Sequence, residues 1–382
     1  MVDGFGGEFS RRELLRSSAA LAATPLLQQA LPREAPAVKT QRVVLVAFAG
    51  GVRSKEVLGT PQNVPNLMRI ARAGVTFPKV RCANVGHYGA ALSLFTGNVE
   101  ALGIRDSERT TNPTLFEILR KDGGFDAGDV WLSTTNGAQG RLFAHSDNPA
   151  YGASFAAQVF DSDGIFNVEF KRLIDSFGRP KPETDAERTR LDRLAHALRR
   201  PGSDDNGSVR QRDVERFILD ELGGANARLT GPGAADAKAI RVGTNLLRAF
   251  RPRLLGITLQ NADVAHSSYN AYVEVIRRND EELGKLWDMI RGDADLRDTT
   301  SLLIVPEFGR DQNLNQRNGL DHGDGSDEMQ QVFLIGAGPE TARDKVVSKE
   351  IRTIDVCPTV LGLLGCKTPS SLRARAIREL RG

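Results

Sequence analysis

The stretch Leu254-Leu255-Gly256-Ile257-Thr258-Leu259 is an apolar run that stops abruptly at Gln260-Asn261-Ala262-Asp263-Val264-Ala265-His266. A short apolar run of this kind is typical of a strand that is buried on both faces of a parallel sheet. In open α/β sheets, ligands bind just beyond the carboxyl ends of such strands. Asp263 and His266 are therefore the first candidate functional residues.

Asp263 and His266 offer an oxygen and a nitrogen donor, which suit zinc and related divalent metals. The spacing Asp-x-x-His also has a structural explanation. Asp263 or Ser267 could cap the helix that follows, with His266 as a hydrogen-bonded residue at the rim of the sheet. The residues alone leave both interpretations open.

Composition sets broad limits on the protein. The chain has 382 residues, of which 40% are hydrophobic and 26% are charged, enough for one large α/β domain or two medium ones. Its 51 basic and 48 acidic residues give a net charge of only +3, so the charge balance does not indicate a nucleic-acid partner. No apolar run approaches the ~20 residues of a membrane span. Three cysteines, Cys82, Cys357 and Cys366, exclude a dense disulfide framework and lack the spacing of a zinc-cysteine site.

The amino terminus predicts export. Ser10-Arg11-Arg12-Glu13-Leu14-Leu15 resembles the twin-arginine motif, and a weakly apolar segment and the small-residue pattern Ala35-Pro36-Ala37 follow it. We therefore expect a signal peptide over residues 1–37, a folded domain over residues 38–382, and a periplasmic or extracellular location. The alternative is a short amphipathic helix that happens to contain two arginines.

The remaining pattern predicts an α/β fold with a doubly wound, mostly parallel sheet and helices on both faces. Strands are expected at residues 42–48, 75–81, 129–132, 302–305 and 332–335. Helices are expected after Asn63 as a cap with Pro65 in the first turn, after the Asn84 turn, over residues 269–290, and after Asp355 as a cap. The charged segment over residues 165–250 has a helical period and is expected to be a helical insertion beside the site.

Several of these pieces, in this order, resemble the alkaline phosphatase superfamily, which includes sulfatases, phosphodiesterases and cofactor-independent phosphoglycerate mutases. The pieces are the strand at residues 43–48, Pro65-Asn66-Leu67, Gly74-Val75-Thr76-Phe77, Asn84-Val85-Gly86-His87 with Thr96-Gly97, and Ile354-Asp355-Val356-Cys357-Pro358-Thr359-Val360-Leu361. The resemblance implies that Asp263, His266 and the distant His322 form one metal site.

The chain also departs from the family pattern at three places. The metal-binding Asp after the first strand corresponds to Gly50, or to Ala49 if the alignment slips by one residue. The Thr or Ser nucleophile corresponds to Ala83, and the Asp-His pair after a late strand corresponds to Glu307-Phe308. The second metal site therefore keeps at most Glu307. Cys82 lacks the downstream Pro and Arg that sulfatases need to mature a cysteine nucleophile.

These matches and departures assign the candidate site. The metal ligands are Asp263, His266, His322 and Glu307, holding a divalent ion, expected to be one zinc per chain. Glu307 or His87 is the catalytic base, and Asn84 and Arg310 bind the anionic substrate. Alternatives stay open for two of them: Glu307 could pair with Arg310, and His87 could cap its helix. Asp321 is expected to orient His322.

The expected function is an exported, metal-dependent hydrolase of a small anionic phosphate or sulfate ester, working with one metal and water. The alternative is a non-catalytic relative that binds an anionic ligand or a protein partner in the same cleft. The sequence indicates neither the substrate nor the oligomeric state.

Overall fold

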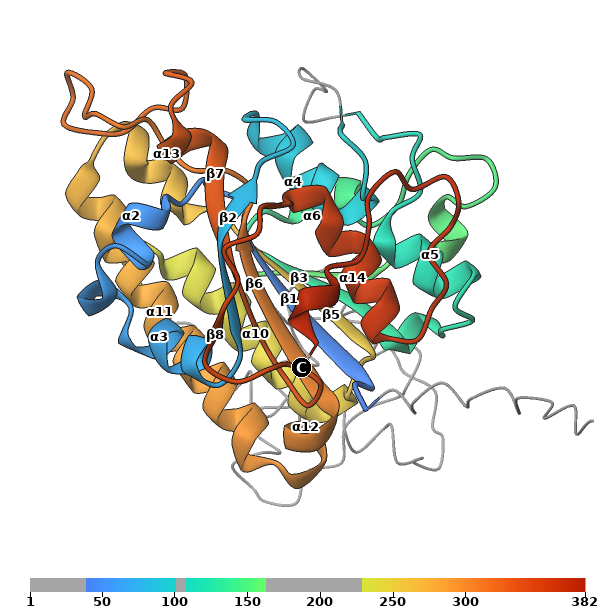
Figure 1. Ribbon diagram of the computed structural model, residues 1–382. Helices are drawn as coiled ribbons and strands as arrows, with labels where there is room; N and C mark the ends of the chain where they lie inside the picture. Colours follow the sequence, from blue (N-terminus) through green and yellow to red (C-terminus); the bar gives the residue numbers. More distant parts are fainter. Residues whose placement is uncertain (1–38, 101–107, 163–228, 382) are drawn as a thin grey trace, which may run out of the picture. The chain divides into compact units, whose positions relative to one another are not determined.

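The computed structural model describes residues 39–100, 108–162 and 229–381, which are built around one mixed sheet (Figure 1). Its strands are β1 (Arg42–Phe48), β2 (Val75–Arg81), β3 (Val130–Thr134), β4 (Gln158–Asp161), β5 (Leu254–Leu259), β6 (Thr300–Pro306), β7 (Gln331–Ala337), β8 (Lys345–Val346) and β9 (Ile351–Arg352). Their order is β4-β3-β5-β1-β6-β7-β2-β8, with β9 also beside β2. Strand β7 is antiparallel to β6 and β2, and the other described pairs are parallel.

Strand β5 has the position that its composition predicts. It lies between β3 and β1, parallel to both, and all six of its residues are buried. A strand covered on both faces has no solvent-facing side, which explains why its sequence is apolar without alternation. The expectation of a doubly wound, mostly parallel sheet is confirmed.

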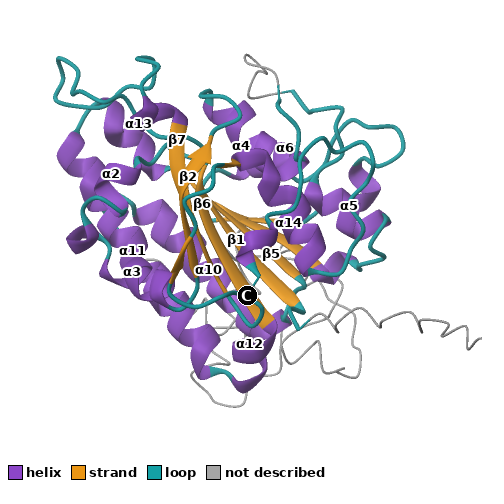
Figure 2. Ribbon diagram, viewed as in Figure 1, coloured by secondary structure: helices purple, strands orange, loops and turns teal. Residues whose placement is uncertain are grey.

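Helices cover both faces of this sheet (Figure 2). They are α2 (Ser54–Val57), α3 (Pro65–Arg72), α4 (His87–Thr96), α5 (Leu115–Lys121), α6 (Gly137–Phe143), α10 (Ala234–Phe250), α11 (Tyr269–Gly292), α12 (Ala294–Thr299), α13 (Asp327–Gln330) and α14 (Val356–Leu363). A hydrophobic core lies on each face of the sheet, and alternate residues of β1 point into one core or the other. Val44 and Val46 join the core under α3, α10 and α11, whereas Val43 and Leu45 join the core under α4, α5 and α14.

The end of the predicted insertion forms part of the layer that covers the sheet. Helix α10 packs on β5 and β3 and buries Ile240, Leu246 and Leu247 completely. The rest of the predicted insertion over residues 165–250, up to residue 228, lies outside the described residues, as does the predicted signal peptide.

The expected Asn63 cap is wrong, and the capping alternative for Asp263 or Ser267 does not hold. Helix α3 begins after Val64 with Pro65 in its first turn, and the Asn63 side chain instead donates to the carbonyl of Glu56 at 3.1 Å. Helix α11 is capped by Ser268, whose Oγ accepts from the Ala271 amide at 3.2 Å. Neither Asp263 nor Ser267 is therefore needed as the cap.

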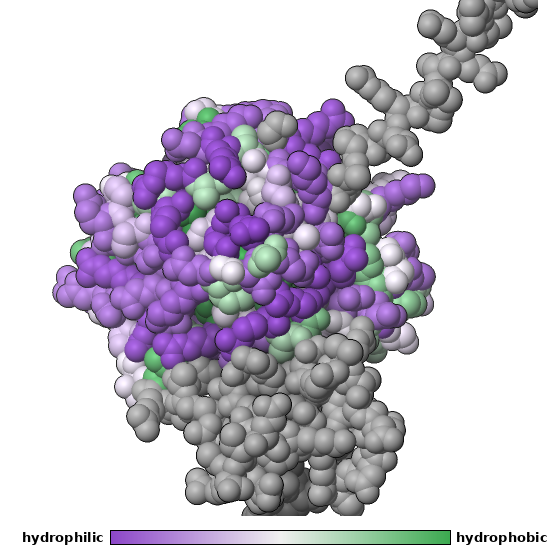
Figure 3. All heavy atoms as spheres, turned by 90° about the horizontal axis from the view of Figure 1, so that it is seen from below, coloured by the Kyte–Doolittle hydropathy of each residue, from purple (hydrophilic) through white to green (hydrophobic). Residues whose placement is uncertain are grey.

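No helix in the described ranges is long and apolar enough to cross a bilayer. The face seen from below in Figure 3 is mostly hydrophilic, with hydrophobic residues in small scattered groups.

Backbone hydrogen bonds hold three chain segments side by side beyond the carboxyl ends of the central strands. The Ala49 amide donates to the Leu259 carbonyl at 2.7 Å, and the Glu307 amide donates to the Phe48 carbonyl at 3.1 Å. The segments that follow β1, β5 and β6 are therefore fixed relative to one another.

A buried carboxylate anchors the segment after β5. Asp236, in the first turn of α10, is 0% exposed and accepts from the amides of Gln260 and Asn261 at 2.9 and 3.1 Å. It also accepts from Thr135 Oγ1 at 2.6 Å and from Asn279 Nδ2 at 2.9 Å. Nothing in its sequence context distinguishes this aspartate from an ordinary first-turn acidic residue.

We predict that Asp236→Ala lowers the free energy of unfolding by about 3 kcal/mol or more, because several buried donors lose their acceptor. Chemical denaturation measures the loss. Asp288→Ala is the control, since Asp288 is exposed and its only ion-pair partner among the described residues is Arg69; its effect is expected to stay below about 1 kcal/mol. Equal effects of the two substitutions would contradict the anchoring role.

Candidate functional site

The candidate site lies where the segments that follow β2, β5 and β6 meet. His87 is the first residue of α4. Asp263 and His266 lie in the 3-10 helix η5 (Asn261–His266), directly after β5. The loop after β6 supplies Glu307, Arg310, Asp321 and His322. We call the group His87, Asp263, His266, Glu307, Arg310 and His322 the central cluster.

His87 is held between two carboxylates. Its Nδ1 lies 2.6 Å from Glu307 Oε1, and its Nε2 lies 2.9 Å from Asp263 Oδ1. The Nε2 atom is buried and has no partner with hydrogen-bond geometry in the described part of the chain. The Glu307 side chain is 0% exposed, so it lies behind His87. Glu307 therefore orients His87 and presents its Nε2 to the cluster.

His266 repeats this arrangement on the other side. Its Nδ1 lies 2.6 Å from Asp321 Oδ1, and its Nε2 lies 3.3 Å from Asp263 Oδ1. Asn315 Nδ2 donates to the other oxygen of Asp321 at 3.0 Å and fixes that carboxylate. The expectation that Asp321 orients His322 is therefore wrong, because this loop directs its carboxylate to His266.

His322 completes a group of three imidazoles. Its ring centroid lies 4.8 Å from that of His87 and 5.0 Å from that of His266. One nitrogen from each of the three rings lies within 4.8 Å of the others, so the group could hold a metal ion. The sequence analysis placed Glu307 among the ligands and His87 outside them. In the structure, His87 is one of the three clustered imidazoles, and Glu307 contacts its Nδ1, while its Nε2 faces Asp263.

The charged groups of the cluster shift one another's pKa values. Burial alone would lower the pKa of His87, but the Glu307 and Asp263 carboxylates outweigh it and raise that pKa to about 9. Burial opposes ionisation of Asp263 too, yet His87 and Arg310 hold its pKa well below its usual range. Burial and then the positive neighbours His87 and Arg310 lower the pKa of His322 to about 4. His322 is therefore neutral near pH 7 and has a free lone pair for a ligand.

These residues fit a divalent ion. A metal-binding histidine usually gives its second ring nitrogen to a carboxylate, as His87 and His266 both do. The buried Nε2 of His87 has no hydrogen-bond partner among the described residues and faces the same Asp263 oxygen as Nε2 of His266. For zinc at ~2.1 Å from each nitrogen, the donors would lie roughly 3.4 Å apart, so the most distant pair must move closer.

The two residues expected to bind substrate are used inside the protein. The Arg310 side chain is 0% exposed and donates to Asp263 Oδ1 at 2.7 Å and to His266 Nε2 at 3.0 Å. Asn84 is 8% exposed; its Nδ2 donates to the Glu100 carbonyl at 3.2 Å, and its Oδ1 accepts from the Gly86 amide at 3.0 Å. Asn84 therefore shapes the turn before α4, and Arg310 does not pair with Glu307.

The position of the missing first-strand aspartate leaves no room for a side chain. A Cβ at Gly50 would lie 2.6 Å from the carbonyl oxygen of Gln260 and 2.9 Å from the amide nitrogen of Asp263. Both contacts are with backbone, which cannot rotate away as a side chain can. An aspartate at this position would therefore collide with the backbone of the segment after β5.

The residues at the other family positions are inert. Ala83 has no nucleophilic atom, and its amide donates to Thr353 Oγ1 at 3.0 Å. Burial, with Glu307 nearby, raises the pKa of Cys82 far above its usual range, so its thiol is not ionised. Phe308 is fully buried, with its ring centroid 4.8 Å from that of His87.

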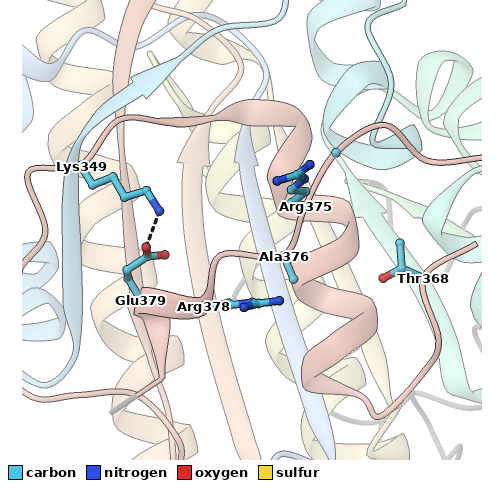
Figure 4. A pocket seen from close by; sticks show the side chains of 7 residues that line it. Lys349, Thr368, Arg375, Ala376, Arg378 and Glu379 are labelled. Carbon is cyan, nitrogen blue, oxygen red and sulfur yellow. Dashed lines mark hydrogen bonds and ion pairs between the residues drawn. The ribbon is translucent and has the colours of Figure 1, made fainter. Parts of the chain in front are cut away.

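A separate hollow of about 600 Å³ lies near the carboxyl terminus (Figure 4). It is lined by Lys349, Thr368, Ala374, Arg375, Ala376, Arg378 and Glu379, and none of the central cluster contributes to it. Lys349 is paired with Glu379 at 2.5 Å, and Arg375 and Arg378 are exposed. Solvated cations of this kind do not define a binding site.

Comparisons with known proteins give structural matches only. No family model and no curated protein matches the sequence. The structure is similar to that of the wild-type alkaline phosphatase PafA, with a TM-score of 0.58 and 11% identity over 91% of this chain and 100% of that one. A putative sulfatase from Bacteroides thetaiotaomicron gives 0.52 and 12% over 89% and 74%, and a phosphonate monoester hydrolase from Silicibacter pomeroyi gives 0.51 and 13% over 89% and 76%.

The raised pKa of His87 predicts a specific pH dependence of stability in the metal-free protein. Its folded pKa of about 9 exceeds the ordinary value of 6.5. The resulting stabilisation is fully present below about pH 6.5 and is lost as the pH rises through about 9. Between these values, wild type should lose stability relative to His87→Gln, measured by thermal unfolding with chelator. Parallel pH profiles would contradict the ion pair.

A second prediction concerns the space around Gly50. Gly50→Asp, which supplies the residue type expected in a two-metal centre, should lower the melting temperature and bind no additional metal, because its Cβ collides with backbone. Gly292→Ala is the control: a Cβ there meets nothing within 4 Å, so stability should stay equal or rise. A stable Gly50→Asp protein that binds an added ion would contradict the prediction, because it would show that the backbone of η5 moves to make room for the side chain.

Proposed function

The chain has the fold of the alkaline phosphatase superfamily, and from this premise we propose that it is an exported hydrolase of phosphate or sulfate esters that uses one divalent metal ion, zinc, per chain. The fold alone does not carry the proposal, because one fold hosts many activities. The observation that carries it is the convergence of His87, His266 and His322, with carboxylates behind two of the three imidazoles.

The three imidazoles would hold the ion, and Asp263 would add an oxygen from the same side. When bound, such an ion supplies Lewis-acid activation of water and of the ester group. Glu307 and Asp321 fix the ring orientations and keep the ligating nitrogens directed inward. Zinc needs the free lone pair of His87 Nε2, so binding must release the proton that His87 carries below about pH 9.

The attacking group in this proposal is water. Ala83 offers no side-chain nucleophile, and the pKa of the half-buried Cys82 thiol is raised far above its usual range. Asp263 is the carboxylate of the cluster with the greatest access to a substrate, since its side chain is 49% exposed while that of Glu307 is 0% exposed. Because His87 and Arg310 hold the pKa of Asp263 well below its usual range, Asp263 would accept a hydrogen bond from this water and orient it, rather than act as a strong base.

A specific observation also favours a second candidate, a non-catalytic relative that binds an anionic ligand or a partner. Two positions that serve catalysis in the superfamily hold Gly50 and Ala83, and the contacts of Gly50 leave no space for a carboxylate. The imidazolium of His87 would then attract an anion without turnover.

The testing experiment is metal analysis of protein purified without chelators from a host that performs twin-arginine export. We expect about one divalent ion per chain, retained in His145→Ala and lost in His322→Ala. His145 is the matched control, because it lies outside the cluster and its Nδ1 is 3.0 Å from the Ser146 carbonyl oxygen.

Turnover of aryl phosphates, aryl sulfates and phosphonate monoesters should follow the metal content, and it should fall by about 100-fold or more in His322→Ala. Folded protein without metal, in wild type and under metal supplementation, would overturn the hydrolase proposal. Bound metal with no turnover of any ester would favour the non-catalytic relative.

A further inference from the structure

Arg310 is the least expected member of the central cluster. Its side chain is completely buried, although a buried guanidinium is costly to desolvate unless all its donors are used. All five N–H groups of Arg310 have acceptors. Nε donates to the Gly51 carbonyl at 3.4 Å, and Nη1 donates to His266 Nε2 at 3.0 Å and to the Leu320 carbonyl at 3.4 Å. Nη2 donates to Asp263 Oδ1 at 2.7 Å and to the Gly50 carbonyl. The guanidinium is therefore a built-in part of the cluster.

The guanidinium uses the same atoms that a metal would use. Nδ1 of His266 is bound to Asp321, so Nε2 has the only lone pair of that ring that can reach the cluster centre, and this lone pair now accepts from Arg310. Asp263 Oδ1 also accepts from Arg310. By contrast, Nε2 of His87 has no hydrogen-bond partner among the described residues.

The chain after β1 is adapted to the guanidinium. Gly51 has φ +68°, and a Cβ there would lie 2.8 Å from Arg310 Nε. The carbonyls of Gly50 and Gly51 both face the guanidinium as acceptors. Two consecutive glycines thus provide the space and the hydrogen-bond acceptors that let a cation lie beneath Asp263 and His266.

We propose that Arg310 is an internal cation that competes with a divalent metal ion for Asp263 and His266. It keeps the metal-free centre folded and charge-balanced, and it weakens metal binding because the ion must displace it from both groups and approach a fixed positive charge. This inference rests on the proposed one-metal function, and it adds that Arg310 sets the metal concentration at which the site binds an ion.

The test is a titration of the full-length exported protein with cobalt(II), followed by its visible absorption, and with zinc, followed by calorimetry. Arg310→Gln should bind either ion about tenfold or more tightly than wild type. It should also unfold at a lower temperature without metal, and added zinc should restore more stability to it than to wild type.

Arg241→Gln is the matched control. Arg241 makes a two-bond ion pair with Glu282 at 2.8 and 2.7 Å, outside the cluster. Its loss should lower stability without changing the affinity for cobalt or zinc. An effect on affinity as large as that of Arg310→Gln would overturn the inference, because it would show that the gain reflects general loosening.

The outcomes separate this inference from the proposed function. Equal affinities of wild type and Arg310→Gln would overturn the inference and leave the one-metal proposal standing. Binding by Arg310→Gln but not by wild type would support the inference and overturn the one-metal proposal. Binding by neither would overturn both.

A measurement on wild type covers the case in which Arg310→Gln does not fold. The side-chain N–H resonances of Arg310 should be protected from hydrogen exchange without metal, because every donor is bound and buried. Saturating zinc should remove that protection if the ion displaces the guanidinium. Unchanged protection in zinc-bound protein would overturn the competition.

Discussion

One carboxylate oxygen, Asp263 Oδ1, has three cationic or imidazole groups around it. It lies 2.7 Å from Arg310 Nη2, 2.9 Å from His87 Nε2 and 3.3 Å from His266 Nε2. These groups come from the segments after three different strands, so this oxygen links three segments at the carboxyl ends of the strands. The buried positive charge of Arg310 is compensated by this carboxylate and by carbonyl groups.

Two constraints behind the cluster keep that arrangement in place. Asp236 fixes the backbone that carries Asp263, through the amides of Gln260 and Asn261. Glu307 and Asp321 fix the rings of His87 and His266, each at 2.6 Å. His87 and His266 thus each have a partner that restricts the rotamer of the ring, which is a condition for a precise ligand or acid–base site.

Backbone packing limits what the segment after β1 can add to the cluster. Gly50 and Gly51 pack so closely against η5 and Arg310 that a side chain at either position would collide with them. The Phe308 ring adds an apolar contact against His87. The centre consists of one group of imidazoles and carboxylates next to one buried guanidinium, which contacts both Asp263 and His266.

The sequence by itself determined the mostly parallel sheet, the positions of its central strands and the edge that carries the polar residues, because burial on both faces of β1 and β5 requires a continuous apolar run. It did not determine the order of the strands in the sheet. It also identified each member of the cluster, since they follow strand ends. Only the tertiary structure decided their roles. Which carboxylate meets which histidine, as Asp321 does with His266 and Glu307 with His87, depends on loop paths that no local pattern encodes. The position of Arg310 depends on glycine carbonyls 259 and 260 residues away along the chain.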